Sequence, residues 1–167
     1  MSALLKYNDQ GFWVSNGVKD TLYEILVAMT RNDHPYVFAQ LDSDESLMGG
    51  RYISGYGFAF DDFERVFGGP DRFEKIVRTN WAVIDDVCKN ERCVSIMQKV
   101  FRWAFWMMKG GRCNYDLKPY AHCRIRFRML IIRLSLGLID LAPDRCEHPS
   151  IGELVDEPPP SVNIFEQ

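Results

Sequence analysis

One stretch, residues 91–109, limits the possible folds of this chain more than any other, because it is apolar around most of a helix. Its sequence is ERCVSIMQKVFRWAFWMMK. At 3.6 residues per turn it leaves only a narrow polar stripe, formed by Ser95, Gln98, Arg102 and Lys109. Gly110 and Gly111 follow, and glycine commonly closes a helix. The pattern therefore predicts a helix that is buried on several sides.

The composition is that of a soluble globular domain. Of 167 residues, 47% are hydrophobic and 26% are charged, which argues against disorder over most of the length. The first ten residues lack the apolar run of a secretory signal. The longest apolar segment, 125–141, carries three arginines and an aspartate, which would be costly in lipid. We therefore expect a cytoplasmic protein that does not enter the membrane.

The remaining periodicity predicts a mainly α fold, a single-domain helical bundle around the central buried helix. A small N-terminal β-hairpin is compatible with residues 4–14, where two apolar runs flank Asn8-Asp9-Gln10-Gly11. Further helices are expected at 18–31, 60–67 and 70–90. We expect one helical domain over residues 1–150, and a proline-rich extended tail over 151–167.

Some segments leave their structure open. The residues after His34-Pro35 suit either a helix or a buried strand, because the run is too short for its period to decide. Segment 42–57 is rich in Gly, Ser and Asp and predicts a loop, with 51–53 extended. Segment 121–141 fits a strand or a helix, and we favour the helix as a partner for 91–109. Helices 70–90 and 91–109 would form an antiparallel hairpin or one kinked helix.

No catalytic or cofactor motif survives inspection. GYGFAF at 55–60 resembles the aromatic strand of RNA-recognition domains, but Ser54 and Asp61 occupy positions where that pattern needs a basic and an aromatic residue. The same glycines lack the third glycine of a dinucleotide-binding loop. We therefore expect aromatic core residues in this glycine-rich stretch, and no cofactor.

Cysteine and histidine raise two further possibilities. The soft ligands Cys113, His122, Cys123, Cys146 and His148 are the candidates for a zinc site, but they lack a paired knuckle. Cys88 and Cys93 have four residues between them but lie at a helix junction. We expect buried, reduced thiols and no metal. A small enzyme that uses Cys113 or His122 is a third alternative for the function.

Charge is unevenly distributed along the chain. Residues 99–133 hold nine bases and one acid, a charge of +8; because the whole chain carries −3, the rest carries −11. A nucleic-acid surface is the alternative function, and its arginines would contact phosphate. Those arginines are Arg124, Arg126, Arg128 and Arg133. We favour instead their pairing with acids on neighbouring helices, because the chain as a whole is acidic.

An acidic segment with nearby aromatics is the candidate contact surface. A concentrated acidic face attracts a basic partner, and aromatic side chains often anchor interfaces. The candidate partner-binding residues are Asp42, Asp44, Glu45, Tyr52, Tyr56, Phe58, Asp61, Asp62 and Glu64.

The leading functional hypothesis is a non-enzymatic protein-binding module. Its most concrete form is a small cytosolic inhibitor of a basic toxin, nuclease or effector, such as a bacterial toxin-immunity protein or a phage-encoded inhibitor of host defence. This hypothesis rests on small size, acidity and the lack of catalytic motifs.

Overall fold

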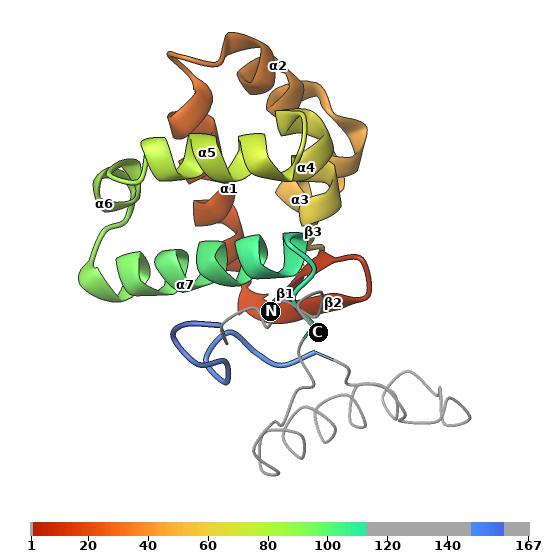
Figure 1. Cartoon of the computed structure of the whole chain (residues 1–167), viewed down its shortest axis with the longest axis vertical. Helices are drawn as coiled ribbons and strands as arrows, with labels where there is room; N and C mark the ends of the chain where they lie inside the picture. The colour runs from red at the N-terminus through yellow and green to blue at the C-terminus, as the bar shows by residue number, and fades with distance from the viewer. Residues whose placement is uncertain (1, 113–147, 159–167) are drawn as a thin grey trace, which may run out of the picture.

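The computed structural model describes residues 2–112 and 148–158 (Figure 1). This part of the chain is mainly helical, with seven helices and a small three-stranded sheet. The strands are β1 (Ser2–Tyr7), β2 (Gln10–Ser15) and β3 (Phe58–Ala59). The helices are α1 (Asn16–Thr30), α2 (Pro35–Ser43), α3 (Glu45–Tyr52), α4 (Phe60–Phe67), α5 (Pro70–Thr79), α6 (Val83–Val87) and α7 (Glu91–Met108).

The sheet begins with the predicted hairpin, which is confirmed. β1 and β2 pair antiparallel, with Leu5 opposite Phe12, and Asn8 takes a positive φ of 52° in the turn. β3 then adds to the other edge of β1 in parallel, with Leu5 opposite Phe58, so that β1 is the central strand. Gly57 permits this approach, because a Cβ there would lie 1.5 Å from the Leu4 carbonyl oxygen.

α1 follows the hairpin directly and agrees closely with the predicted helix at 18–31. The Ser15 side chain caps it by accepting a hydrogen bond of 3.3 Å from the Val18 amide. Its buried face includes Leu22, Ile25 and Leu26. α1 passes behind α5 and α7 in Figure 1 and contacts both of them.

The segment after His34 is a helix, which resolves the open alternative, and the predicted loop at 42–57 is wrong over its first half. Pro35 starts α2, and Asp44 starts α3 by accepting hydrogen bonds from the Ser46 and Leu47 amides. Residues 51 and 52 are helical and not extended. Gly50 lets α3 pack against β3, because a Cβ at Gly50 would lie 2.4 Å from the Phe58 ring.

The predicted helix at 60–67 is confirmed, whereas the one at 70–90 is broken. α4 ends at Gly68, whose φ of 88° is left-handed. α5 stops at Thr79, where the Asn80 side chain donates a 2.8 Å hydrogen bond to the Ile76 carbonyl. The turn that follows places Trp81 against Phe101 of α7, with ring centroids 5.9 Å apart.

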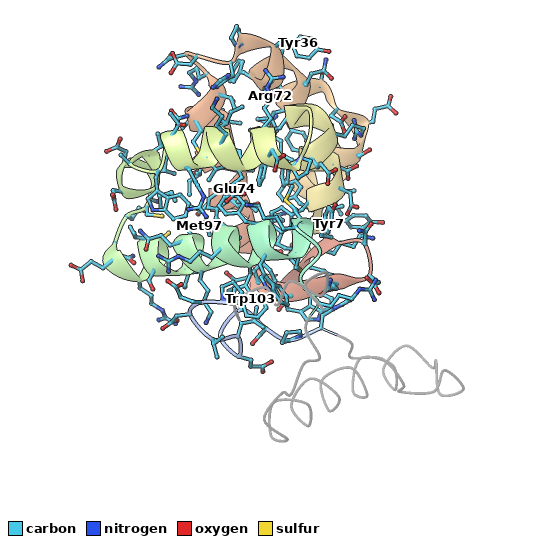
Figure 2. The ribbon with its side chains drawn as sticks, viewed as in Figure 1. Tyr7, Tyr36, Arg72, Glu74, Met97 and Trp103 are labelled. Atoms are coloured by element: carbon cyan, nitrogen blue, oxygen red, sulfur yellow. The ribbon has the colours of Figure 1, made fainter. Side chains whose placement is uncertain are left out.

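α7 matches the predicted helix at 91–109, and its apolar face is buried, including Val100, Phe101 and Ala104. α5 and α7 lie antiparallel, as one of the two predicted arrangements required (Figure 1). Glu74 of α5 joins them, as Figure 2 shows, since its carboxylate pairs with Arg78 and with Lys109. Burial opposes ionisation of Glu74, but these two contacts outweigh it and lower its pKa.

A bundle arranged around α7 is not confirmed. The predicted partner segment 121–141 lies outside the described residues. Among the residues that the structure describes, no helix combines the length and the apolar character needed to cross a membrane.

Phenylalanine side chains form much of the core between the sheet, α4, α5 and α7. Phe73 is fully buried at their centre. Its ring centroid lies 4.9 Å from that of Phe67, 5.9 Å from that of Phe105 and 6.3 Å from that of Phe63. Because aromatic rings bury large areas and prefer tilted or offset contacts, this cluster supplies much of the packing.

Residues 148–158 return to the domain and lie against β2 and α7. The Trp13 amide donates to the Pro149 carbonyl at 2.7 Å, and the Ile151 amide donates to the Trp13 carbonyl at 2.8 Å. The Trp103 indole of α7 donates to the Val155 carbonyl at 2.9 Å. The predicted domain boundary at residue 150 stays a prediction.

Candidate functional site

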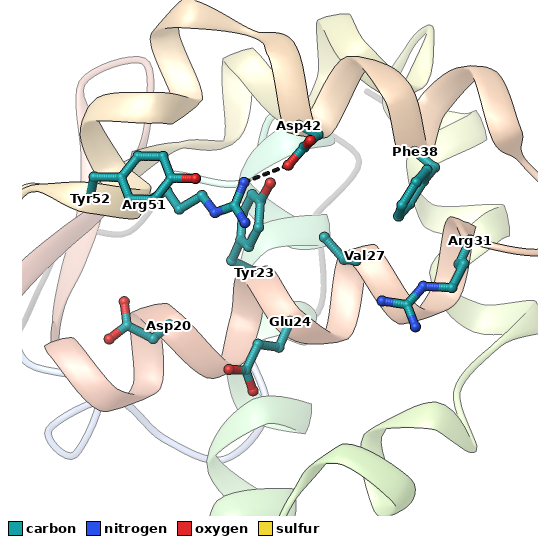
Figure 3. Close-up of a pocket in the computed structure, with 9 residues that line it drawn as sticks. All are labelled: Asp20, Tyr23, Glu24, Val27, Arg31, Phe38, Asp42, Arg51 and Tyr52. Carbon is teal, nitrogen blue, oxygen red and sulfur yellow. Dashed lines mark hydrogen bonds and ion pairs between the residues drawn. The ribbon is translucent and has the colours of Figure 1, made fainter.

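A cleft of about 570 Å³ lies between α1 and the pair α2 and α3 (Figure 3). Tyr23 forms part of its floor. The Tyr23 hydroxyl donates to the Leu41 carbonyl at 3.0 Å, and burial raises the pKa of Tyr23. This tyrosine is therefore a neutral, structural part of the wall.

Arg51 fixes one end of the cleft. Its guanidinium carbon lies 4.8 Å from the ring centroids of both Tyr23 and Tyr52, and the group also pairs with Asp42. The hydrogen bond to Asp42 raises the pKa of Arg51, so the cation is permanent. Stacking of a guanidinium on an aromatic ring is favourable and restricts the rotamers of both side chains. Tyr52 is therefore held in place although it is exposed.

Two acids of α1, Asp20 and Glu24, line the opposite side of the cleft, as Figure 3 shows. The Asp20 carboxylate lies 3.2 Å from the ammonium group of Lys19. Within the described part of the chain, Glu24 makes no ion pair, and its side chain is exposed. Asp20 and Glu24 are four residues apart on the polar face of α1. Such spacing is typical of any solvated helix face, so the sequence offers no reason to predict these two acids as binding residues.

A rigid turn presents apolar side chains beside this cleft. The Tyr56 amide donates to the Ile53 carbonyl at 3.1 Å, and Gly55 has the positive φ of 84° that a type II turn needs at its third position. Asn16 at the start of α1 secures the turn by bonding to Ser54 and to the Gly55 amide.

Three large apolar side chains of this segment, which we call the 52–56 turn, face solvent. Tyr52 is 64% exposed, Ile53 50% and Tyr56 61%. Aromatic residues exposed on a rigid support are typical of interface anchors, because little conformational entropy is lost when they bind. Two of the predicted aromatic anchors, Tyr52 and Tyr56, therefore lie on one surface.

Phe58, the third predicted anchor, is not on that surface. It is 2% exposed, and its ring stacks on Tyr23 at 5.9 Å and packs against Phe63 at 5.2 Å. The side chain alternates in direction along the strand, so that β3 turns Phe58 into the core.

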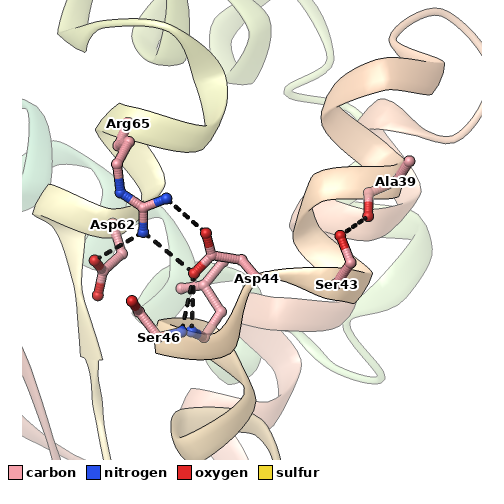
Figure 4. A network of polar contacts seen from close by, with 7 residues as sticks. Ala39, Ser43, Asp44, Ser46, Asp62 and Arg65 are labelled. Carbon is pink, nitrogen blue, oxygen red and sulfur yellow. Dashed lines mark hydrogen bonds and ion pairs between the residues drawn. The ribbon is translucent and has the colours of Figure 1, made fainter.

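The predicted acidic face is largely occupied by local contacts (Figure 4). Asp44 caps α3 and pairs with Arg65 at 2.6 Å, and Asp62 pairs with the same guanidinium at 3.1 Å. The hydrogen bond from Arg65 lowers the pKa of Asp44, although burial opposes the shift. These two aspartates stabilise the fold, and little of their charge is available to a partner.

The other predicted acids differ in their contacts. Asp61 accepts a 3.0 Å hydrogen bond from the Asn8 amide. Glu64 bonds to the Tyr7 hydroxyl and, after burial, is the second cause that raises the pKa of Tyr7 to about 12. Glu45 is exposed in the first turn of α3. In the cleft, Asp20 pairs with Lys19 and Asp42 pairs with Arg51, so Glu24 is the cleft acid that has no ion pair among the described residues.

The remaining candidates lie outside the described residues. These are the arginines of the nucleic-acid alternative, Arg124, Arg126, Arg128 and Arg133, and the ligands Cys113, His122, Cys123 and Cys146. His148 is described, in the segment beside β2. Within residues 2–112 and 148–158, no three Cys, His, Asp or Glu side chains are grouped as metal ligands would be.

No protein-family model matches this chain, and neither a curated protein nor a solved structure is significantly similar to it.

Proposed function

We propose that the protein is a non-enzymatic protein-binding module that contacts its partner through the 52–56 turn and the acidic side of the adjoining cleft. The observation that carries the proposal is the exposure of Tyr52, Ile53 and Tyr56 by half or more on a hydrogen-bonded turn. Such a group is costly to leave in water and gains most when a partner covers it.

The charge beside the turn supports a basic partner. Glu24 and Asp20 form one side of the cleft, and the aromatic edge of Tyr52 forms another. A lysine or arginine side chain fits this combination, because its stem packs on the ring while its charged end reaches a carboxylate.

The more specific form of the proposal is an inhibitor that occludes a basic toxin, nuclease or effector, as toxin-immunity proteins and phage-encoded inhibitors do. A chain of 167 residues with a net charge of −3 suits this role. It acts by covering a surface and needs no chemistry of its own.

The test has two stages. Tagged full-length protein is used to capture partners from its own cells at moderate salt, and the proteins and nucleic acids in the eluate are identified. The affinity of a purified protein partner is then measured by calorimetry for the wild type and for Tyr52→Ala/Tyr56→Ala. We expect the double substitution to weaken binding at least tenfold.

Tyr36→Ala is the matched control. Tyr36 is 72% exposed at the start of α2, outside the 52–56 turn, and the control should keep the wild-type affinity (Figure 2). Equal affinities for the wild type and the double variant would contradict the proposed surface. Capture of nucleic acid that survives competitor would contradict the proposed function and favour the arginine alternative.

A further inference from the structure

Two cysteines meet at the junction between α6 and α7. Cys88 is the C-terminal cap of α6, and its amide donates to the Ile84 carbonyl at 2.9 Å. Cys93 lies in the first turn of α7, where its amide donates to the Asn90 side chain at 2.9 Å. The two backbone anchors direct both side chains to one place, and the Sγ atoms lie 2.9 Å apart as free thiols.

This distance is shorter than a usual contact between two sulfur atoms and longer than a covalent bond. An S–S bond measures about 2.05 Å, so the sulfur atoms need to approach by only about 1 Å. The connecting turn, 89–92, contains no proline. Small rotations of the two side chains can close the gap while the helices stay in place.

Small reagents can reach the pair from solvent. Cys88 is 9% exposed, and Cys93 is half-buried. Cys88 also lines an open surface hollow of about 390 Å³, together with Lys89, Asn90 and Val94. This volume is large enough for a hydroperoxide or a small thiol, and Cys93 is not among the residues that line it.

The two thiols differ in their environment. Burial, followed by the hydrogen bond between Cys88 and Cys93, raises the pKa of Cys88 to about 12, so this thiol stays protonated at neutral pH. The thiolate is the nucleophilic form of cysteine. Cys93 is also the more exposed of the two thiols, so the first attack on an oxidant is assigned to Cys93, and Cys88 acts as the second, resolving thiol.

We propose that Cys88 and Cys93 are an oxidation site that forms an intramolecular disulfide with hydroperoxides and is reversed by thiols. The Cys93 thiol releases its proton, its thiolate attacks the peroxide oxygen, and the O–O bond breaks. Cys93 becomes a sulfenic acid, and the alkoxide or hydroxide that leaves takes up the released proton to depart as alcohol or water. Cys88 sulfur then attacks the Cys93 sulfur, the S–O bond breaks, and the hydroxide that leaves takes the Cys88 proton to form water. Two thiols lose two electrons in total, and the peroxide gains them.

The disulfide would join the end of α6 to the beginning of α7. Because the structure already places the two sulfur atoms together, the bond forms within the native fold and does not require unfolding. This proposal is independent of the protein-binding proposal, since it concerns a different part of the chain and a different chemistry.

The test treats the purified, folded, full-length protein with hydrogen peroxide at a small molar excess. Free thiols are blocked by alkylation, and the linked peptides are mapped by mass spectrometry without reduction. We expect a mass loss of two hydrogens and a peptide pair that joins Cys88 to Cys93. Dithiothreitol should restore both thiols. Mapping also distinguishes this bond from any bond that involves Cys113, Cys123 or Cys146.

Cys88→Ser is the variant that isolates the first step. It should stop at the sulfenic acid of Cys93, which dimedone labels, while the wild type should escape labelling there because the disulfide forms first. In Cys93→Ser, oxidation at Cys88 should be at least tenfold slower. Recovery of both wild-type thiols unmodified under these conditions would overturn the proposal. So would a Cys88–Cys93 bond that forms only after denaturation.

Discussion

Two groups of aromatic and apolar side chains differ in their exposure to solvent. The phenylalanines around Phe73 are buried among the sheet, α4, α5 and α7, while Tyr52, Ile53 and Tyr56 stand in solvent on a rigid turn. The two groups are neighbours in sequence, because Tyr56 is exposed and Phe58, two residues later, is buried. Hydrophobic character alone therefore does not separate residues that stabilise the fold from residues available to a partner.

The path of the backbone determines which of these side chains are exposed and which are buried. Gly55 turns the chain after α3, and Gly57 lets it approach β1 closely enough for β3 to pair. Tyr52, Ile53 and Tyr56 face solvent before this point, and Phe58 enters the core. If this comparison is right, substitutions in the buried group should affect stability, and substitutions in the exposed group should affect binding.

The largest expected effect is that of Phe73→Ala. Removal of a fully buried ring that contacts several others leaves a cavity, and we expect the free energy of unfolding to fall by about 3–5 kcal/mol. Urea denaturation followed by circular dichroism measures the change. A loss below about 1 kcal/mol would show that the cluster is not the main packing centre.

The converse substitution, Tyr52→Ala/Tyr56→Ala, should affect binding much more than folding. Interface anchors often contribute about 2 kcal/mol or more each, so the affinity for the partner is expected to fall about 30-fold if one of the two rings is an anchor and about 1,000-fold if both are. The free energy of unfolding should change by less than about 1 kcal/mol, since both rings are more than half exposed. Loss of stability as large as that of Phe73→Ala would remove the distinction between the two groups.

Two neighbouring glycines of α3 sharpen the comparison within one helix. A Cβ at Gly50 would lie 2.4 Å from the Phe58 ring, whereas a Cβ at Gly49 would meet only Tyr56, at 3.7 Å. Gly50→Ala should therefore destabilise the protein by about 1–3 kcal/mol. Gly49→Ala should stabilise it by about 0.5–1 kcal/mol, because alanine favours the helix. Thermal unfolding of both variants tests this, and equal effects would contradict the packing of α3 against β3.

The smallest expected effect is on the ion pair of Asp44, and it distinguishes acids that stabilise the fold from acids that are available to a partner. The pKa of Asp44 is lowered by Arg65, so its ion pair contributes stability at pH values above the unfolded pKa of about 4 and loses it as the pH falls through the lower folded pKa. Asp44→Asn retains a capping oxygen but loses the charge, and should cost about 0.5–1 kcal/mol at pH 7.

That cost should shrink toward zero as the pH falls from about 4 to 2, which pH-dependent urea titrations of both proteins can measure. Glu24→Gln is the matched control, because its carboxylate has no partner among residues 2–112 and 148–158. A pH-independent difference between the wild type and Asp44→Asn would show that the ion pair contributes nothing.

The longest periodic elements could be predicted from the sequence. Elements whose structure depends on contacts with residues far away in the chain could not. The helix at 91–109, the helix at 18–31 and the hairpin at 4–14 follow from local patterns of many residues. The composition of 42–57 favours a loop, yet α3 forms because Asp44 caps it and because Gly50 leaves room against Phe58. A two-residue parallel strand such as β3 has no local signal, since its partner in β1 is more than fifty residues away.

The candidate site divides in the same way. Tyr52 and Tyr56 could be predicted as exposed anchors from their type and from the turn residues around them. The direction of Phe58 depends on its pairing with β1, and the neutralisation of Asp44 and Asp62 depends on Arg65 of α4. Asp20 and Glu24 become candidate binding residues only because they line the cleft that α2 and α3 form opposite α1, and the sequence does not show this cleft.

The central place of β1 in the sheet has a consequence for synthesis on the ribosome. The β1–β2 hairpin emerges before the segments that cover it, because one of its edges is covered by β3 and the other by the segment around Ser150. At about 5–20 residues per second, the first cover arrives roughly 2–9 s after the hairpin, and the second later still. During this interval the nascent chain exposes open strand edges, which are sites of mispairing between chains. Fast translation or a chaperone on the ribosome would therefore protect the β1–β2 hairpin from mispairing until the segment around Ser150 is made.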